Sequence, residues 1–316
     1  MPKKLELRDA RRVTSEAASF RRPAWSPDGR RLVLEANERN GALYLTDGKG
    51  RIETHLADGA EASWSPDGAR LAFTRVGADG RHEVWVCDVA APESARRLAG
   101  GDGGSWEHPA WSPDGQHVAA ASDYGNPTGI RHLWLLDAVL GDRRRLTGDP
   151  QRSDGHPAWS PDGRAIAFDG DDRADDAREI DVYVLELASG TVTRLTDGTV
   201  ATRRPAFVDR RWLLAERRSV TGPALVVVDR EKKRTLPVGE KPDGEREPAA
   251  RMRKRRVVVA YVRRDEPDGE GHDAVWIAEL TGLKPMSEAE AAEEALRDAV
   301  AAVERAGLPT LDGDAK

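Results

Sequence analysis

The sequence predicts an all-β protein: a six-bladed β-propeller of four-stranded blades, with the ring closed by the N-terminal strand and a C-terminal α-helix. The first observation is a repeat, because Trp-Ser-Pro-Asp-Gly begins at Trp25, Trp64, Trp111 and Trp159. The second is a pair of weaker copies in the same phase, Pro205-Ala206-Phe207 and Pro248-Ala249-Ala250. The third is the spacing of 39, 47, 48, 48 and 43 residues between equivalent positions, which indicates a repeated supersecondary unit.

Each unit begins with a strand that ends in a tight turn. In Ser-Pro-Asp-Gly, the proline presets φ, the aspartate accepts local backbone hydrogen bonds and the glycine adopts the left-handed conformation. Two apolar strands follow, as at 165–168 and 182–185, and a short strand such as 193–196 completes the unit. The loops between the second and third strands vary while the strands repeat, so we expect these loops to carry recognition on one face of the ring.

These repeats identify a family resemblance. Pro-Ala-Trp-Ser-Pro-Asp-Gly-Arg, an apolar strand, an aromatic-containing strand and Arg-Leu-Thr together resemble the repeat of the TolB-type β-propeller family over roughly residues 5–280. The resemblance implies the propeller fold and, by the precedent of TolB, a protein partner engaged through the propeller. The same repeat also occurs in propellers of prolyl-oligopeptidase-type enzymes and of some polysaccharide lyases, so it does not by itself choose between binding and catalysis.

The ends of the chain define the expected domain limits. We expect a propeller over 1–282, with blades beginning near 23, 62, 109, 157, 205 and 248. Residues 10–14 match the fourth-strand pattern at 143–147, so residues 5–14 are expected to complete the last blade. Residues 283–316 form a predicted helical tail, because Ser287-Glu288-Ala289-Glu290 is a capping box before an alanine- and glutamate-rich run.

Composition limits the classes of function. The net charge of -6 argues against a general nucleic-acid-binding protein. No run of 18 apolar residues is present, so we expect no membrane insertion. The N-terminus lacks an apolar signal segment, which predicts a cytoplasmic protein, or a periplasmic one if the chain is trimmed. The single cysteine, Cys87, lies in an apolar strand and is interpreted as a packed residue, and the oligomeric state stays open.

Basic residues are concentrated late in the chain. Residues 201–264 contain 19 lysines and arginines against 8 aspartates and glutamates. The run 251–256 replaces the Ser-Pro-Asp-Gly turn, which places it on the face opposite the recognition loops. Three interpretations stay open: a solvated hairpin, a dock for the acidic C-terminal helix, or a site for an anionic partner.

The sequence offers no assignable catalytic residue. It has no Gly-x-Ser-x-Gly elbow, no phosphate-binding glycine loop and no His-Glu-x-x-His or paired Cys-x-x-Cys motif. Aligning the blades at the residue before Pro-Ala-Trp instead gives six ionisable residues, one in each blade. These residues, here called the rim residues, are Arg22, Glu61, His108, His156, Arg204 and Glu247. The repeat predicts that all six lie at the mouth of the central channel.

We therefore expect a non-catalytic scaffold that binds a protein segment or peptide at this mouth, with Trp106 and Tyr124 as apolar contacts beside the rim residues. No cofactor is expected. The alternative is a metal-dependent lyase or hydrolase that acts on a sugar or lactone at the same place. Its candidate metal ligands are Glu61, His108 and His156, since two imidazoles and a carboxylate can hold a divalent transition metal.

Overall fold

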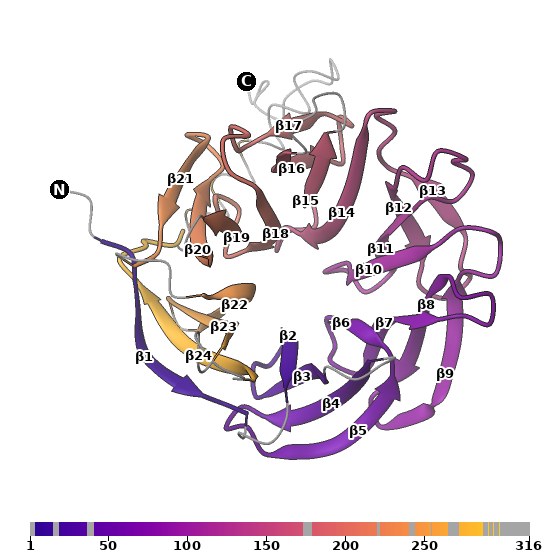
Figure 1. Ribbon diagram of the computed structural model, residues 1–316, viewed down its shortest axis with the longest axis horizontal. Coiled ribbons are helices and arrows are strands. Elements are labelled where there is room, and N and C mark those ends of the chain that lie inside the picture. The colour runs from indigo at the N-terminus through magenta and orange to yellow at the C-terminus, as the bar shows by residue number, and fades with distance from the viewer. Residues whose placement is uncertain are drawn as a thin grey trace, which may run out of the picture.

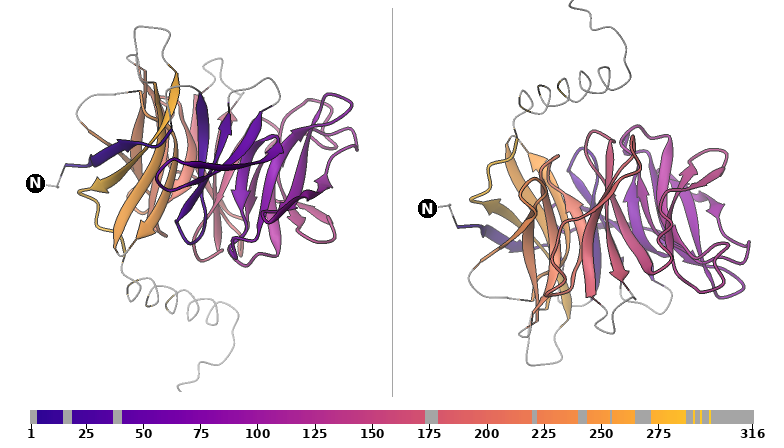
Figure 2. Two further views of the ribbon diagram at one scale, coloured as in Figure 1. Left: turned by 90° about the horizontal axis from the view of Figure 1, so that it is seen from below. Right: turned by 90° about the horizontal axis from the view of Figure 1, so that it is seen from above.

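The predicted propeller is the observed fold. The computed structural model describes residues 4–14, 19–36, 41–172, 179–219, 222–239, 244–253, 255–264 and 272–286, with 290, 293 and 297. In this part of the chain, the strands form six four-stranded sheets arranged around a central axis (Figure 1). The edge-on views show the strands of each blade running between two faces of the ring (Figure 2).

The first three blades follow one another along the chain, each with its strands in sequence order from the axis outward. Blade one contains β2 (Phe20–Trp25), β3 (Arg31–Ala36), β4 (Ala42–Asp47) and β5 (Ile52–Asp58). Blade two contains β6 (Ala60–Trp64), β7 (Arg70–Val76), β8 (His82–Asp88) and β9 (Ala91–Ala99). Blade three contains β10 (Trp106–Trp111), β11 (His117–Ser122), β12 (His132–Asp137) and β13 (Arg143–Arg145).

The last three blades include the two weak repeats, which keep the same strand order. Blade four contains β14 (Arg152–Trp159), β15 (Ala165–Asp172), β16 (Glu179–Glu186) and β17 (Val192–Arg194). Blade five contains β18 (Thr202–Phe207), β19 (Trp212–Ser219), β20 (Gly222–Asp229) and β21 (Arg234–Pro237). Blade six contains β22 (Arg246–Arg253), β23 (Arg256–Arg264), β24 (Asp273–Thr281) and β1 (Glu6–Arg12).

The outermost strand of blade six comes from the opposite end of the chain. β1 pairs antiparallel with β24, from Glu6 opposite Thr281 to Arg12 opposite Trp276. Beyond the strand, the Val13 N–H donates to the Val275 carbonyl at 2.8 Å. The predicted closure of the ring by the N-terminal segment is confirmed (Figure 1).

The Ser-Pro-Asp-Gly turns carry the hydrogen bonds that their sequence predicts. In blade one, Ser26 Oγ donates to Asp28 Oδ1 at 2.6 Å and accepts from the Arg31 N–H at 3.0 Å. Gly29 has φ +65, in the left-handed region that favours glycine. The same serine-aspartate bond recurs in blades two, three and four. The turn joins the innermost strand to its neighbour on the face opposite the channel mouth.

The core is divided among the spaces between blades. Six apolar clusters occur among the described residues, and each combines side chains from two adjacent blades. One cluster packs Phe73 of blade two against Val33 and Leu43 of blade one. Cys87 is buried in β8 in this same cluster, as predicted, and burial raises the pKa of its thiol to about 11. Rigid packing between blades holds the rim residues in fixed relative positions.

The predicted C-terminal helix falls in 283–316, a segment almost wholly outside the described residues. Four of the predicted recognition loops also lie partly outside them, at 37–40, 173–178, 220–221 and 265–271. In the described part of the chain, no helix is both long and apolar enough to span a bilayer.

Candidate functional site at the channel mouth

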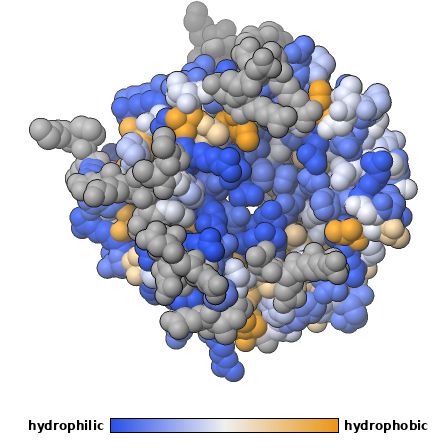
Figure 3. Space-filling model, viewed as in Figure 1, coloured by the Kyte–Doolittle hydropathy of each residue, from blue (hydrophilic) through white to orange (hydrophobic). Residues whose placement is uncertain are grey.

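The six rim residues line one cavity on the propeller axis. Its volume is about 210 Å³, and the residue that follows each rim residue completes the wall. Those following residues are Pro23, Ala62, Pro109, Pro157, Pro205 and Pro248. Hydrophilic residues surround the hollow at the centre of this face (Figure 3). The structure thus brings together six residues that lie about 40–50 residues apart in the sequence, while their role in binding stays a prediction.

A β-bulge positions each rim residue. The pairing of the first and second strands shifts register across this position in all six blades. Every rim residue has a positive φ, between 45 and 58, which is uncommon for residues other than glycine. The bulge turns the side chain out of the strand alternation toward the axis. Residues held in this region of φ cluster at binding and catalytic sites, so the repeated strain marks the rim as a candidate site.

Carboxylates hold the backbone of the rim in place. The N–H groups of five rim residues donate to a carboxylate of the preceding blade. The nitrogen–oxygen distances are 2.8–3.2 Å in the pairs Arg22–Glu247, Glu61–Glu35, His108–Glu61, Arg204–Asp169 and Glu247–Glu216. These charge-assisted bonds compensate part of the cost of the left-handed backbone.

Three of these acceptors were not among the predicted site residues. Glu35, Asp169 and Glu216, here called the inner carboxylates, lie on the second strands β3, β15 and β19. Each belongs to a blade whose rim residue is an arginine or a histidine. In blades two and six the rim residue is itself the glutamate, and Thr74 and Val262 occupy the second-strand position. An acidic residue inside an otherwise apolar second strand is the sequence signal that identifies them.

Arginines neutralise two of the inner carboxylates. Arg21 and Arg22 both contact Glu35, at 2.6 and 2.9 Å. In the same way, Arg203 and Arg204 contact Glu216, at 2.7 and 3.5 Å. Burial lowers the pKa of Arg22, but Glu61 and Glu35 outweigh it, so the pKa of this guanidinium is raised and it stays charged.

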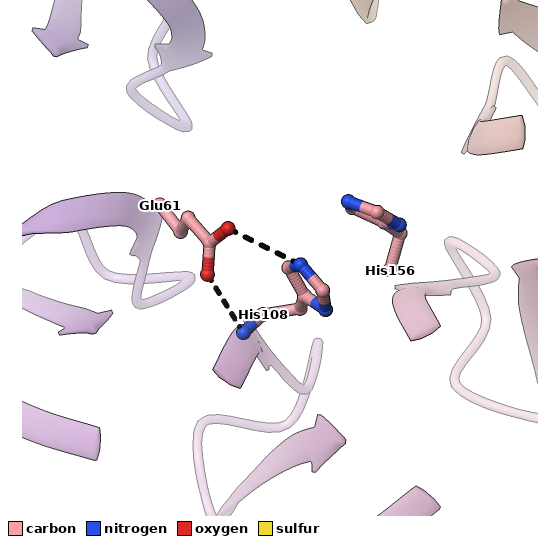
Figure 4. A group of neighbouring side chains, drawn as sticks. All are labelled: Glu61, His108 and His156. Atoms are coloured by element: carbon pink, nitrogen blue, oxygen red, sulfur yellow. Dashed lines mark hydrogen bonds and ion pairs between the residues drawn. The ribbon is translucent and has the colours of Figure 1, made fainter. Parts of the chain in front are cut away.

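A stacked pair of histidines occupies one side of the rim (Figure 4). The ring centroids of His108 and His156 lie 3.8 Å apart, with 30° between the planes. His108 Nε2 lies 3.2 Å from Glu61 Oε1, and His156 Nδ1 lies 2.9 Å from Asp169 Oδ2. Arg204 Nε donates to His156 Nε2 at 3.3 Å, so this nitrogen is an acceptor and the ring is neutral.

Ionisation in this cluster follows from burial and charge. Burial lowers the pKa of His156, which keeps its imidazole neutral near pH 7. Burial alone would raise the pKa of Asp169, but the His156 imidazole lowers it to about 2. Burial alone would also raise the pKa of Glu61. His108 and Arg22 have the stronger effect, so the pKa of Glu61 lies well below its usual value. Both carboxyl groups are therefore ionised at neutral pH.

The histidine pair and Glu61 lie close enough together to hold a metal ion, but their surroundings fit one only in part. One ligand atom from each of Glu61, His108 and His156 lies within 4.8 Å of the others. Buried His108 Nδ1 has no hydrogen-bond partner in the part of the chain that the structure describes. However, Arg204 occupies the lone pair of His156, and Arg22 Nη2 lies 3.5 Å from Glu61 Oε1. A metal ion would have to displace or tolerate two neighbouring guanidinium groups.

The two predicted apolar contacts do not line the cavity. Trp106 is fully buried and packs against Tyr124 and Trp134, and its indole N–H donates to Asp102 at 3.2 Å. Tyr124 lies beneath the Arg143 guanidinium, 3.9 Å from the ring centroid. Trp106 precedes His108 by two residues and would share its face in a regular strand. The bulge after Glu107 breaks this alternation and leaves Trp106 in the core, and the contact of Trp106 with a ligand stays a prediction.

Comparison with known proteins assigns the family. The model of the TolB beta propeller domain matches residues 61–245, more than half of the chain. The chain therefore belongs to the TolB β-propeller family. No functionally curated protein matches the sequence.

Solved structures with the same fold include TolB proteins and an enzyme. TolB from Acinetobacter baumannii is 25% identical with a TM-score of 0.62, over 75% of this chain and 58% of that one. The chain thus spans little more than half the length of that TolB. A putative TolB from Agrobacterium tumefaciens is 19% identical with a TM-score of 0.62, over 85% and 93% of the two chains. An oligogalacturonate lyase in complex with manganese is 15% identical with a TM-score of 0.54, over 89% and 97%.

Proposed function

We propose that this propeller is a non-catalytic scaffold that recognises a protein segment at its channel mouth. The observation that carries the proposal is the layering of charge around the cavity. The side chains of Arg22, His156 and Arg204 are 25%, 25% and 19% exposed. Glu35 and Glu216 beneath them are 0% and 1% exposed. Donors therefore face the solvent while their counter-charges lie below.

A second cavity extends the binding surface away from the axis. Its volume is about 370 Å³, and it shares Arg22, Glu61 and His108 with the channel mouth. It continues to Val76 and His82, so it runs outward over blade two. The two cavities together form a groove that suits an extended segment rather than a single side chain. Val76, which is 48% exposed, supplies an apolar contact along this path.

The layering specifies what the segment presents to the rim. Guanidinium donors at the surface of a site favour a ligand group that accepts hydrogen bonds. A carboxylate, either at the end of a chain or on an aspartate or glutamate, satisfies these donors best. We therefore infer a segment that places a carboxylate in the channel and lies extended over blade two.

The first prediction tests this proposal with selected peptides. A random peptide library is selected on the immobilised propeller, and the affinity of enriched peptides is measured by fluorescence polarisation. We expect acidic residues or a free C-terminus to be enriched. Arg204→Gln removes a charged donor worth about 1.5–3 kcal/mol, so it is expected to weaken binding about tenfold or more.

The matched control is Arg144→Gln, because Arg144 is exposed on the outer strand β13 of blade three. It is expected to bind the selected peptides with unchanged affinity, and circular dichroism verifies that all variants are folded. Equal affinity of wild type, Arg204→Gln and Arg144→Gln would place the peptide elsewhere and refute recognition at the mouth.

A second candidate function is a metal-dependent lyase or hydrolase acting on a sugar or lactone. The cluster of Glu61, His108 and His156 favours it, since these are the ligand types of manganese and zinc sites. The likeness to the manganese-bound oligogalacturonate lyase concerns the fold alone. The two guanidinium groups beside the cluster place this candidate second, because positive charge next to a ligand disfavours a bound cation.

The second prediction separates the two candidates by metal analysis. Protein dialysed against manganese and zinc is measured by plasma mass spectrometry, beside the His108→Ala/His156→Ala double variant. The scaffold proposal expects less than about 0.1 equivalent of metal in both proteins, because Arg204 already occupies His156. One equivalent in the wild type, lost in the double variant, would support the enzyme instead.

A further inference from the structure

A third cavity, also lined by charged residues, lies where the two ends of the ring meet, on the face opposite the channel mouth. Its volume is about 390 Å³. The walls come from the four strands of blade six, β22, β23, β24 and β1, and from β2 and two turns of blade one. We call it the seam cavity. Apolar parts of its wall are Trp25, Val258, Ile277 and Ala278.

Basic side chains outnumber acidic ones around the seam cavity. The basic residues are Arg11, Arg30, Lys49, Arg251 and Arg253, and the acidic residues are Asp9, Asp47 and Glu279. Two of the carboxylates are already engaged. Asp47 Oδ1 accepts the Arg51 N–H at 2.8 Å, and Glu279 Oε2 accepts from Arg256 Nη1 at 3.0 Å. The cavity therefore has an excess of positive charge.

Arg251 is the most constrained of these basic residues. Its guanidinium carbon lies 4.2 Å from the Trp25 ring centroid. A Cβ at Gly29 would lie 1.4 Å from Arg251 Nη1, so the guanidinium packs directly against this glycine. Arg251 Nε is buried and has no hydrogen-bond partner among the described residues. Burial and the neighbouring Arg253 lower the pKa of Arg251 by more than the Asp28 carboxylate raises it.

The sixth repeat explains how this charge arises. In the four strong repeats, the third turn residue is an aspartate: Asp28, Asp67, Asp114 or Asp162. Arg253 occupies the equivalent position in blade six, and Arg251 replaces the serine. The turn that carries an aspartate in the four strong repeats is basic here, next to the blade-one turn that carries Arg30.

We propose that the seam cavity binds a phosphate group. Guanidinium and ammonium groups from several separate segments surround one space, which suits a tetrahedral dianion with several acceptor oxygens. A bound phosphate would supply a counter-ion to Arg251. Because blades six and one both line the cavity, this ligand would also stabilise the closed ring.

The third prediction is a phosphate-dependent increase in melting temperature. Thermal unfolding is measured in inorganic phosphate and in chloride at equal pH and ionic strength, and the dissociation constant is obtained by calorimetric titration. We expect phosphate to raise the melting temperature of the wild type. Arg251→Gln/Arg253→Gln is expected to weaken binding about tenfold or more. Lys49→Gln, at an exposed position, tests the site without removing a packed side chain.

Two comparisons make the assignment specific. Arg144→Gln, on β13 of blade three, is expected to bind phosphate as the wild type does. Acetate at equal ionic strength is expected to protect less than phosphate, and equal protection would overturn the assignment to a dianion. Phosphoserine distinguishes the source: tighter binding than inorganic phosphate indicates a phosphate ester, and weaker binding indicates the free ion. An equal response of wild type, Lys49→Gln and Arg251→Gln/Arg253→Gln would refute the site.

Discussion

Replacing Glu35 with glutamine is expected to lower the free energy of unfolding by about 3 kcal/mol. The Glu35 side chain is 0% exposed and accepts hydrogen bonds from Arg21 Nε at 2.7 Å and Arg22 Nη1 at 2.9 Å. It also accepts the Glu61 N–H of the next blade at 3.1 Å. Glutamine keeps the shape but loses the charge, which removes the carboxylate that two partly buried guanidinium groups share. Urea unfolding monitored by circular dichroism measures the effect.

Glu93→Gln is the matched control for this variant. Glu93 is an exposed carboxylate on β9, far from the axis, and its replacement is expected to change the unfolding free energy by less than about 0.5 kcal/mol. If both variants unfolded at the urea concentration of the wild type, the inner carboxylates would not support the rim as described here.

The arrangement of the rim residues could be predicted because the repeat fixes their phase. A proline follows five of the six rim residues, and the conserved spacing to the tryptophan position aligns all blades. Rotational symmetry then brings equivalent positions to the axis, which no local pattern in a single blade would indicate. The N-terminal strand could be placed for the same reason, since residues 10–14 repeat the pattern of 143–147.

The conformation of the rim could not be predicted from local rules. A residue before proline is expected to be extended, yet Arg22, His108, His156, Arg204 and Glu247 all have positive φ. The carboxylates of neighbouring blades stabilise this conformation, and these contacts join residues as distant as Arg22 and Glu247. The position of Trp106 in the core has the same origin, because strand alternation holds only as far as the bulge.

The inner carboxylates change the chemical interpretation of the rim. By sequence alone, the six rim residues have two arginines, two glutamates and two histidines, and their mixed charge is compatible with a metal or with a peptide. Glu35, Asp169 and Glu216 add three negative charges below the surface. They hold the Arg204 guanidinium where it occupies the free lone pair of His156, and the Arg22 guanidinium where it approaches Glu61. The structure thus supports binding of an acceptor group more strongly than binding of a cation.

Deleting residues 1–14 is expected to open the ring and lower the free energy of unfolding by about 3–6 kcal/mol. The deletion removes β1 and with it the side chains of Leu5 and Val13, each 6% exposed. Burying a side chain of this kind contributes about 1.5–3 kcal/mol. The hydrogen bonds from Val13 N–H to the Val275 carbonyl and from Val275 N–H to Thr14 Oγ1 are lost as well. Differential scanning calorimetry measures the decrease in melting temperature.

The second consequence of this deletion is a change in association. Without β1, strand β24 presents unpaired N–H and C=O groups along an exposed edge, which favours pairing with another chain. Size-exclusion chromatography with light scattering is expected to show larger species. A synthetic peptide of residues 4–14 added in excess should restore the elution profile of the full chain. Arg8→Gln, at a side chain 66% exposed on β1, is the control that leaves the strand in place. An unchanged melting temperature after deletion would mean that the other five blades and three remaining strands hold the ring closed, because β1 then contributes no net stability.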